Sequence, residues 1–232
     1  MRKFLSAVLC IALTAALTGC GQPGPEAGNA SSGGNEMTMP AVKSAENAEN
    51  KAPAWDYPIR SWDAARESGL DFIGWKDSCN PPEDVLHALS ARELARLTLS
   101  YPLLPYMPSG ATDCEAEIFI GVFEGYSTIF AELRRREDRN ACILAEYAAN
   151  VPDIDAWNAG ETENTANWAE HFTEQYLFVY AKELTPAERD FYLKTVEEKR
   201  EKYYSGLSGE IPAPGLCFDE NGAAYRKGYE GK

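Results

Sequence analysis

Residues 118–133 read IFIGVFEGYSTIFAEL, and this stretch predicts the central element of the fold. Its large apolar side chains recur at steps of three and four residues, which places them on one face of an α-helix. They are Ile118, Phe119, Val122, Phe123, Tyr126, Ile129, Phe130 and Leu133. Because this face is wide, we expect one continuous helix within residues 115–136, the longest of the chain, with neighbours on more than one side. Phe123, Ile129 and Phe130 should be largely buried.

Helix-start signals lie on both sides of this stretch. Ser90 and Glu93 stand three residues apart, as do Thr185 and Glu188, and this is the spacing of a capping box. The remaining patterns predict helices over residues 61–68, 138–147 and 165–182, and a last helix that ends near residue 204. Pro81 and Pro82 suit the entry to a further helix that carries Val85, Leu86 and Leu89. Loops are expected after residue 101, where the chain should be extended, and over residues 153–164. Short connections between these helices suit stacked helical hairpins.

The C-terminal tail carries a different signal. Asn221 and Gly222 lie between the short apolar runs 216–218 and 223–225, a pattern typical of a β-hairpin. A lone two-stranded hairpin is only marginally stable, so we expect this one to lean on the helices. The sequence therefore predicts a mainly α fold: a multi-helix extracytoplasmic domain over residues 55–206 and a tail over 207–232 that contains a small hairpin.

The N-terminus indicates where the protein resides. A basic start followed by an apolar run over residues 4–17 is typical of a signal peptide, and the run is short for a permanent transmembrane helix. Residues 17–20 read LTGC, which resembles the lipobox of bacterial lipoproteins. The resemblance implies that residues 1–19 are removed as a lipoprotein signal peptide. Diacylglycerol on the Cys20 thiol would then anchor the protein in membrane lipid at the extracytoplasmic face of the cell membrane.

Composition separates a linker from the folded part. Residues 20–54 are rich in Gly, Pro, Ala, Ser, Asn and Glu and have almost no large apolar side chains, so we expect a disordered spacer after the lipidated cysteine. The chain carries a formal net charge of −14. A charge this acidic disfavours nucleic acid and anionic headgroups as partners.

Two blocks of sequence carry a resemblance to a known family. The first reads PEDVL at residues 82–86, LSAREL at 89–94 and LSYPL at 99–103; the second contains EL at 132–133 and RED at 136–138, followed by Leu144 and Tyr147. These blocks resemble a family of secreted proteins and lipoproteins of clostridia and other Gram-positive bacteria for which no activity is established. The resemblance implies a helical extracytoplasmic module. It carries over no catalytic residue, because the shared motifs are those that begin and end helices.

Few residues suggest a reaction. Glu170, His171 and Glu174 lie at helical spacing and are weak candidate metal ligands, but a solvated polar face explains them better. The acidic stretch 153–161 resembles a calcium loop whose ligand spacing is not kept, which favours a polar surface loop. Cys142 could pair with His171 as a catalytic thiol, yet its helical neighbours favour a small buried residue. We therefore expect no catalytic residue, no metal and no other cofactor.

Four cysteines, Cys79, Cys114, Cys142 and Cys217, lie beyond the lipobox. Outside the cytoplasm they could form disulfides. Cys114 and Cys142 would stand near opposite ends of the continuous helix, too far apart to be bridged. Two complete connectivities remain, and the shorter loops favour Cys79–Cys114 with Cys142–Cys217.

Two function classes remain open. The first is a non-enzymatic, lipid-anchored module that presents a helical surface to a protein or cell-wall partner. The second is an extracytoplasmic hydrolase acting on wall glycan or peptide, for which carboxylates abound although no pair stands out. Trp157 and Trp168 flank the long loop and could stack on sugar rings, but most aromatic side chains should fill the core. Because the sequence has no nucleophile elbow and no clear metal set, the module is favoured.

Overall fold

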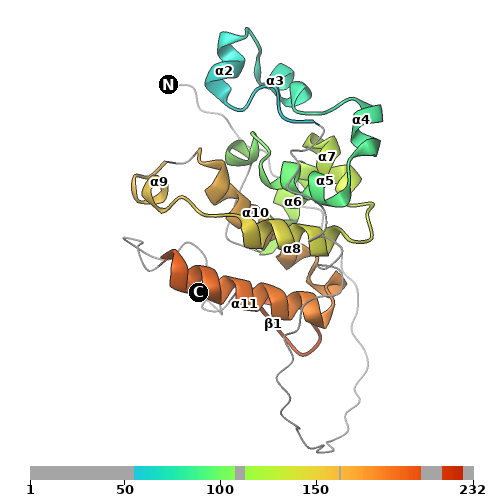
Figure 1. Cartoon of the computed structure of the whole chain (residues 1–232), viewed down its shortest axis with the longest axis vertical. Coiled ribbons are helices and arrows are strands. Elements are labelled where there is room, and N and C mark those ends of the chain that lie inside the picture. The colour runs from blue at the N-terminus through green and yellow to red at the C-terminus, as the bar shows by residue number, and fades with distance from the viewer. Residues whose placement is uncertain (1–54, 108–112, 162, 205–215, 227–232) are drawn as a thin grey trace, which may run out of the picture. The chain divides into compact units, whose positions relative to one another are not determined.

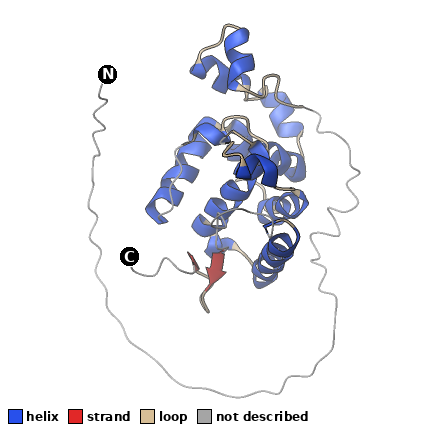
Figure 2. Ribbon diagram, turned by 90° about the vertical axis from the view of Figure 1, so that its left-hand side faces the viewer, coloured by secondary structure: helices blue, strands red, loops and turns tan. Residues whose placement is uncertain are grey.

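The fold is mainly α, with one short β-hairpin near the C-terminus (Figure 1; Figure 2). A computed structural model describes residues 55–107, 113–161, 163–204 and 216–226, which all belong to one compact unit of the chain. The helices are α2 (Trp62–Glu67), α3 (Phe72–Ser78), α4 (Glu83–Ala88), α5 (Ala91–Leu99), α6 (Asp113–Tyr126), α7 (Thr128–Leu133), α8 (Arg139–Ala149), α9 (Ile154–Asn158), α10 (Thr165–Val179) and α11 (Pro186–Lys202). Two 3-10 helices, η1 (Leu104–Tyr106) and η2 (Ala181–Glu183), precede α6 and α11, and the strands are β1 (Leu216–Phe218) and β2 (Ala224–Arg226).

The core forms where α5, α6, α7, α8 and α10 pack together. Helix α5 packs against α7 and α8, and α6 packs against α10. At the centre, the ring of Phe123 lies 5.1 Å from that of Phe130 and 5.0 Å from that of Phe172, measured between ring centroids. The side chains of Phe123, Ile129 and Phe130 are fully buried, so their expected burial is confirmed.

Both predicted capping boxes are confirmed. In each box the hydroxyl oxygen of the first residue accepts from the backbone N–H of the glutamate, and the glutamate accepts in return. The backbone N–H of Ser90 donates to the Glu93 carboxylate at 2.9 Å, and that of Thr185 donates to the Glu188 carboxylate at 2.8 Å. These bonds satisfy backbone N–H groups that the first turns of α5 and α11 leave without a helical partner.

The stretch that the sequence predicts as one helix is two. Helix α6 ends at Tyr126 and α7 begins at Thr128, and Ser127 between them is extended (φ −114°, ψ 109°). The Ser127 hydroxyl accepts from the N–H of Phe130 at 3.2 Å, and the N–H of Thr128 donates to Asn80 Oδ1 at 2.8 Å. The backbone is extended at Ser127, and the side chains of Ser127 and Asn80 accept from the first N–H groups of α7. The prediction of a continuous helix is therefore wrong. The longest helix among the described residues is instead α11, with 17 residues.

Three local expectations are also corrected. Residues 153–164 are not all loop, because α9 forms there and the Asp153 side chain accepts from the N–H of Ala156 at 2.9 Å. The chain after residue 101 forms η1 rather than an extended loop, since the N–H of Tyr106 donates to the carbonyl of Leu103. On α6, Ile118 is 53% exposed, so the buried face is narrower than the periodicity suggests.

The predicted hairpin forms and packs against the helices. Strands β1 and β2 are antiparallel, with Cys217 opposite Tyr225, and both strands contact α10. The backbone N–H of Leu216 donates to the hydroxyl of Tyr192 on α11 at 3.2 Å. Gly222 has a φ of +78° and lies so close to the guanidinium of Arg189 that an added Cβ would collide with it. The hairpin is therefore held by α11 as well as by α10.

Candidate functional site

A buried ion pair joins α10 to α11. Glu170 lies on α10 and Lys199 near the C-terminal end of α11, with side chains only 8% and 4% exposed. The Nζ atom of Lys199 lies 2.5 Å from Oε1 of Glu170. Taking two charges out of water is costly, so a buried pair persists only where further polar contacts complete it.

Three neighbours complete the pair. Lys199 Nζ donates a second hydrogen bond to the backbone carbonyl of Asn150, the residue that ends α8, at 2.7 Å. The Tyr204 hydroxyl donates to Oε2 of Glu170 at 2.9 Å. Lys199 Nζ also lies 4.2 Å from the ring centre of Tyr147, a cation–π contact. We refer to Tyr147, Asn150, Glu170, Lys199 and Tyr204 as the Lys199 cluster.

Burial sets the ionisation of this cluster. It lowers the pKa of Lys199 below its ordinary value, although the Glu170 carboxylate acts in the opposite direction. It raises the pKa of Tyr204, and the Glu170 charge adds to that rise, so the phenol stays neutral and donates. The polar groups are directed at one another, so the chemical effect of the arrangement is to bind α8, α10 and α11 together.

Arginines neutralise the other well-buried carboxylates. Glu132, whose side chain is 8% exposed, lies 3.0 Å from Arg135 and 2.9 Å from Arg136. Glu146, whose side chain is 11% exposed, accepts from Nε of Arg92 at 2.9 Å. The Glu146–Arg92 pair links α8 to α5 and so contributes to the packing of these two helices.

Glu183 of η2 receives two arginines. It pairs with Arg139 of α8, and Arg134 lies 3.4 Å from its carboxylate. Burial acts to raise the pKa of Glu183, but hydrogen bonding and charge from the two arginines outweigh it, and the pKa lies below its ordinary value. The guanidinium of Arg134 also lies 3.6 Å from the ring centre of Tyr180, so it stacks on that ring.

The weak candidate metal ligands of the sequence are divided between two neighbours. Glu170 pairs with Lys199, whereas the His171 ring meets the rings of Phe119 and Trp168 edge-on, with centroids 5.7 Å and 5.2 Å away. Within residues 55–107, 113–161, 163–204 and 216–226 there is no group of three or more His, Cys, Asp and Glu side chains suited to a metal. Glu170 and His171 are therefore engaged in different contacts on α10: the carboxylate in an ion pair and the imidazole among aromatic rings.

The described residues of the loop beside α9 hold no group suited to a metal. Its Asp153 caps α9, and the carboxylate also accepts from Asn164 Nδ2 at 3.0 Å. A hollow in this part of the described surface is lined by Gly160, Glu161, Glu163 and Asn164. Trp157 and Trp168 do not belong to that lining, so the hollow gives no support to sugar stacking on them.

The side chains of three cysteines lie within the described residues. Cys79, Cys142 and Cys217 carry free thiols, and the side chain of Cys114 lies outside the described residues, so the disulfide pairing stays a prediction. Burial raises the pKa of both Cys79 and Cys142 to about 12, and the Asp138 charge adds to the rise at Cys142. A thiol with so high a pKa is a poor nucleophile at neutral pH.

Sequence reasoning did not identify Lys199, which is the partner of Glu170. One signal was present: Tyr192, Thr195 and Lys199 lie at steps of three and four, so the lysine falls on the side of α11 that carries the aromatic residue. A lysine on such a stripe indicates either a long side chain reaching to water or a buried pair, and only the folded chain distinguishes the two.

None of the helices within residues 55–107, 113–161 and 163–204 has the length and apolarity needed for a bilayer span. Cys20, the predicted lipid attachment site, lies outside the described residues. No family model matches the chain, and neither a curated protein nor a solved structure does.

Proposed function

We propose that this is a lipid-anchored protein of the cell surface whose helical domain is a non-enzymatic interaction module. The anchor is diacylglycerol on Cys20, which the LTGC motif at residues 17–20 and the signal-peptide pattern before it support. Two acyl chains hold a protein stably at a membrane, whereas one chain binds only marginally. The resemblance to Gram-positive lipoproteins favours the outer leaflet of a single membrane.

The main support for a non-enzymatic role is that the buried carboxylates are paired with other side chains. The Glu170 carboxylate is paired with Lys199 and accepts hydrogen bonds from Asn150 and Tyr204. The Glu132 carboxylate is paired with Arg135 and Arg136, three and four residues further along the chain. A hydrolase needs an acid, base or nucleophile directed at a cleft where substrate can lie. Carboxylates directed at other side chains stabilise packing instead. This favours a module over the alternative, an extracytoplasmic hydrolase acting on wall glycan or peptide.

No single apolar patch identifies the surface that the partner would contact. The exposed large apolar side chains among the described residues lie on five different segments: Ile73, Ile118, Val151, Leu193 and Tyr225. Isolated exposed apolar residues are ordinary on a soluble surface. The proposal therefore states the kind of protein and its position, and leaves its partner as a protein or a wall component.

The anchor is tested with Cys20→Ala. Cells expressing wild type or the variant are labelled with a fatty acid, and the protein is followed by detergent phase partitioning. We expect the wild type to carry the label and enter the detergent phase, and the variant to do neither while keeping the same far-UV circular dichroism. Equal partitioning of both proteins, with no label on the wild type, would leave an ordinary secreted protein.

The module is tested against the hydrolase on purified cell wall. The mature protein is incubated with dye-labelled wall, and soluble fragments are measured alongside the protein that sediments with the wall. We expect no more soluble dye than with heat-unfolded protein, whether or not the protein sediments. Catalytic release of soluble fragments by the folded protein would contradict the module and favour the hydrolase.

A further inference from the structure

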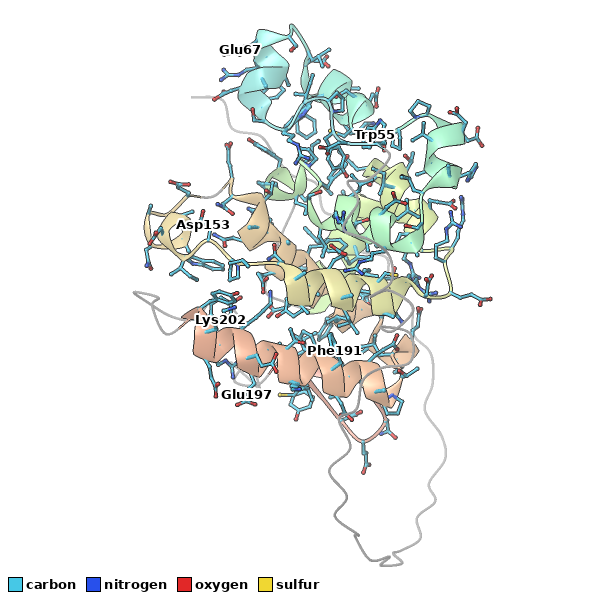
Figure 3. All side chains as sticks on the ribbon, in the orientation of Figure 1. Trp55, Glu67, Asp153, Phe191, Glu197 and Lys202 are labelled. Carbon is cyan, nitrogen blue, oxygen red and sulfur yellow. The ribbon has the colours of Figure 1, made fainter. Side chains whose placement is uncertain are left out.

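Helix α11 is long but buries little of its surface. Of its 17 residues Tyr192, Thr195 and Lys199 are buried, and Phe191 and Val196 pack against the core while only partly buried. Figure 3 shows Phe191 on the side of α11 nearest α8 and Glu197 on the opposite side. By contrast, α10 has 15 residues and buries eight of them, including Phe172, among the core helices. A helix that buries three of 17 residues loses fewer contacts on separating than one that buries eight of 15.

Polar contacts near the C-terminal end of α11 compensate for its few buried residues. Lys199 reaches both the Glu170 carboxylate and the Asn150 carbonyl, so one side chain ties α11 to α10 and to the end of α8. Tyr204, just beyond α11, adds a hydrogen bond to the same carboxylate. The attachment at this end therefore depends on a few specific partners rather than on buried area.

The β1–β2 hairpin is joined to α11 by contacts with Tyr192 and Arg189. Leu216 bonds to the Tyr192 hydroxyl, and the ring of Phe218 meets the Tyr192 ring edge-on with centroids 6.1 Å apart. Gly222 is seated against Arg189. Although the hairpin also touches α10, its side-chain and hydrogen-bond contacts with α11 link the two elements, so the separation of one disturbs the other.

We propose that α11 and the β1–β2 hairpin form a strap that opens as one unit, and that the Glu170–Lys199 pair is its clasp. Opening uncovers the Tyr147 ring, the Asn150 carbonyl and the Glu170 carboxylate, which the closed strap covers. The strap is independent of the lipid anchor and of the proposed interaction role, since it concerns only the order in which parts of the domain open.

Native-state hydrogen exchange, followed by mass spectrometry on the full mature chain in detergent, tests the strap. We expect peptides from α11 and from residues 216–226 to exchange together, through an opening that is more frequent than the one exposing α5 and α8. Coincident exchange of α11 with α5 and α8 would overturn the proposal, because α11 would then open only with the whole domain.

The clasp is tested with Glu170→Gln, which leaves Lys199 without a buried counter-charge. Breaking a buried pair in this way should raise the open population of the strap about 100-fold. The matched control is Glu198→Gln on α11, the helix of Lys199; the Glu198 carboxylate lies 3.7 Å from Lys194 and its side chain is 65% exposed. An exposed pair contributes little, so the control should change the open population at most about fivefold. Equal effects of the two variants would show that the pair is not a clasp.

A second variant covers the case in which Glu170→Gln unfolds the whole domain. The double variant Glu170→Leu/Lys199→Met replaces the pair with apolar side chains, a change that proteins often tolerate. We expect it to restore the core and to close the strap more tightly than in Glu170→Gln, because no unpaired charge is left buried. Asn150 and Tyr204 lose their hydrogen bonds to the pair, so the closure should not exceed that of the wild type. A double variant in which the core is restored while the strap remains as open as in Glu170→Gln would overturn the role of the pair.

Discussion

Helices α10 and α11 lie in the same domain but are held by different forces. α10 contributes Phe172 and Tyr176 to a cluster of rings shared with α6 and α7, and both side chains are fully buried. α11 buries Tyr192 and then relies on Lys199, whose attachment requires a carboxylate on α10 and a carbonyl at the end of α8. The first mode depends on area and shape, and the second on a few named partners. Their responses to substitution should differ accordingly.

The largest effect is expected in the shared ring cluster. Phe130 is fully buried, and its ring lies 5.1 Å from that of Phe123 and 5.5 Å from that of Phe172, between centroids. Phe130→Ala removes those contacts and leaves a cavity, so the free energy of unfolding should fall by about 3–5 kcal/mol. Urea denaturation measures it.

The matched control for Phe130→Ala is Leu193→Ala on α11, where the side chain is 40% exposed. We expect a change within about 0.5 kcal/mol at this position. If both variants lost the same stability, the contrast between a packed core and a weakly buried α11 would be incorrect.

Two substitutions with a smaller expected effect should show whether α5 and α11 unfold in the same cooperative unit. Ser90→Ala and Thr185→Ala each remove the hydroxyl of a capping box, and each should cost about 1 kcal/mol. Because α5 lies in the core, the loss at Ser90 should lower the free energy of global unfolding. The loss at Thr185 should instead appear as faster hydrogen exchange within α11 and the hairpin. Global destabilisation of similar size by both variants would place α11 in the same cooperative unit as α5.

The same contrast explains how much of the fold the sequence predicts. Helix starts such as Ser90 and Thr185 are recognised because their partners lie three residues away, and the hairpin is recognised because Asn221-Gly222 and its flanking strands are local. The break at Ser127 is missed, since the apolar spacing continues across it. Asn80, whose side chain accepts from the backbone N–H of Thr128 at the start of α7, is 48 residues away in the sequence. No short sequence pattern predicts a contact over that distance.

The candidate site is predicted less well for the same reason. Glu170 is identified as a polar residue of interest but assigned to a solvated face with His171. Its partner Lys199 stands 29 residues away on another helix, and the pair exists only after α10 and α11 pack. Local patterns report which residues are polar, whereas tertiary packing decides which polar residues are buried and paired.

The smallest expected effect is the pH dependence of stability that Glu183 contributes. Its ion pairs with Arg134 and Arg139 lie outside the strap. The pKa of Glu183 lies below its ordinary value because Arg139 and Arg134 outweigh the effect of burial. A carboxyl group whose pKa is lower in the folded state stabilises the fold above its unfolded pKa, and this contribution is lost as the pH falls through the folded pKa. The unfolded pKa is about 4.3 for a glutamate, so the contribution should be complete at pH 7 and should fade below about pH 4.

Glu183→Gln should therefore destabilise the protein at pH 7 and less so at pH 3, by a modest amount because the side chain is 40% exposed to screening water. Denaturant titrations at the two pH values measure this difference, with Glu197→Gln on the outer side of α11 as the control that should show little change at either pH. A destabilisation by Glu183→Gln that is as large at pH 3 as at pH 7 would mean that the arginines hold η2 by geometry alone and not through the charge of Glu183.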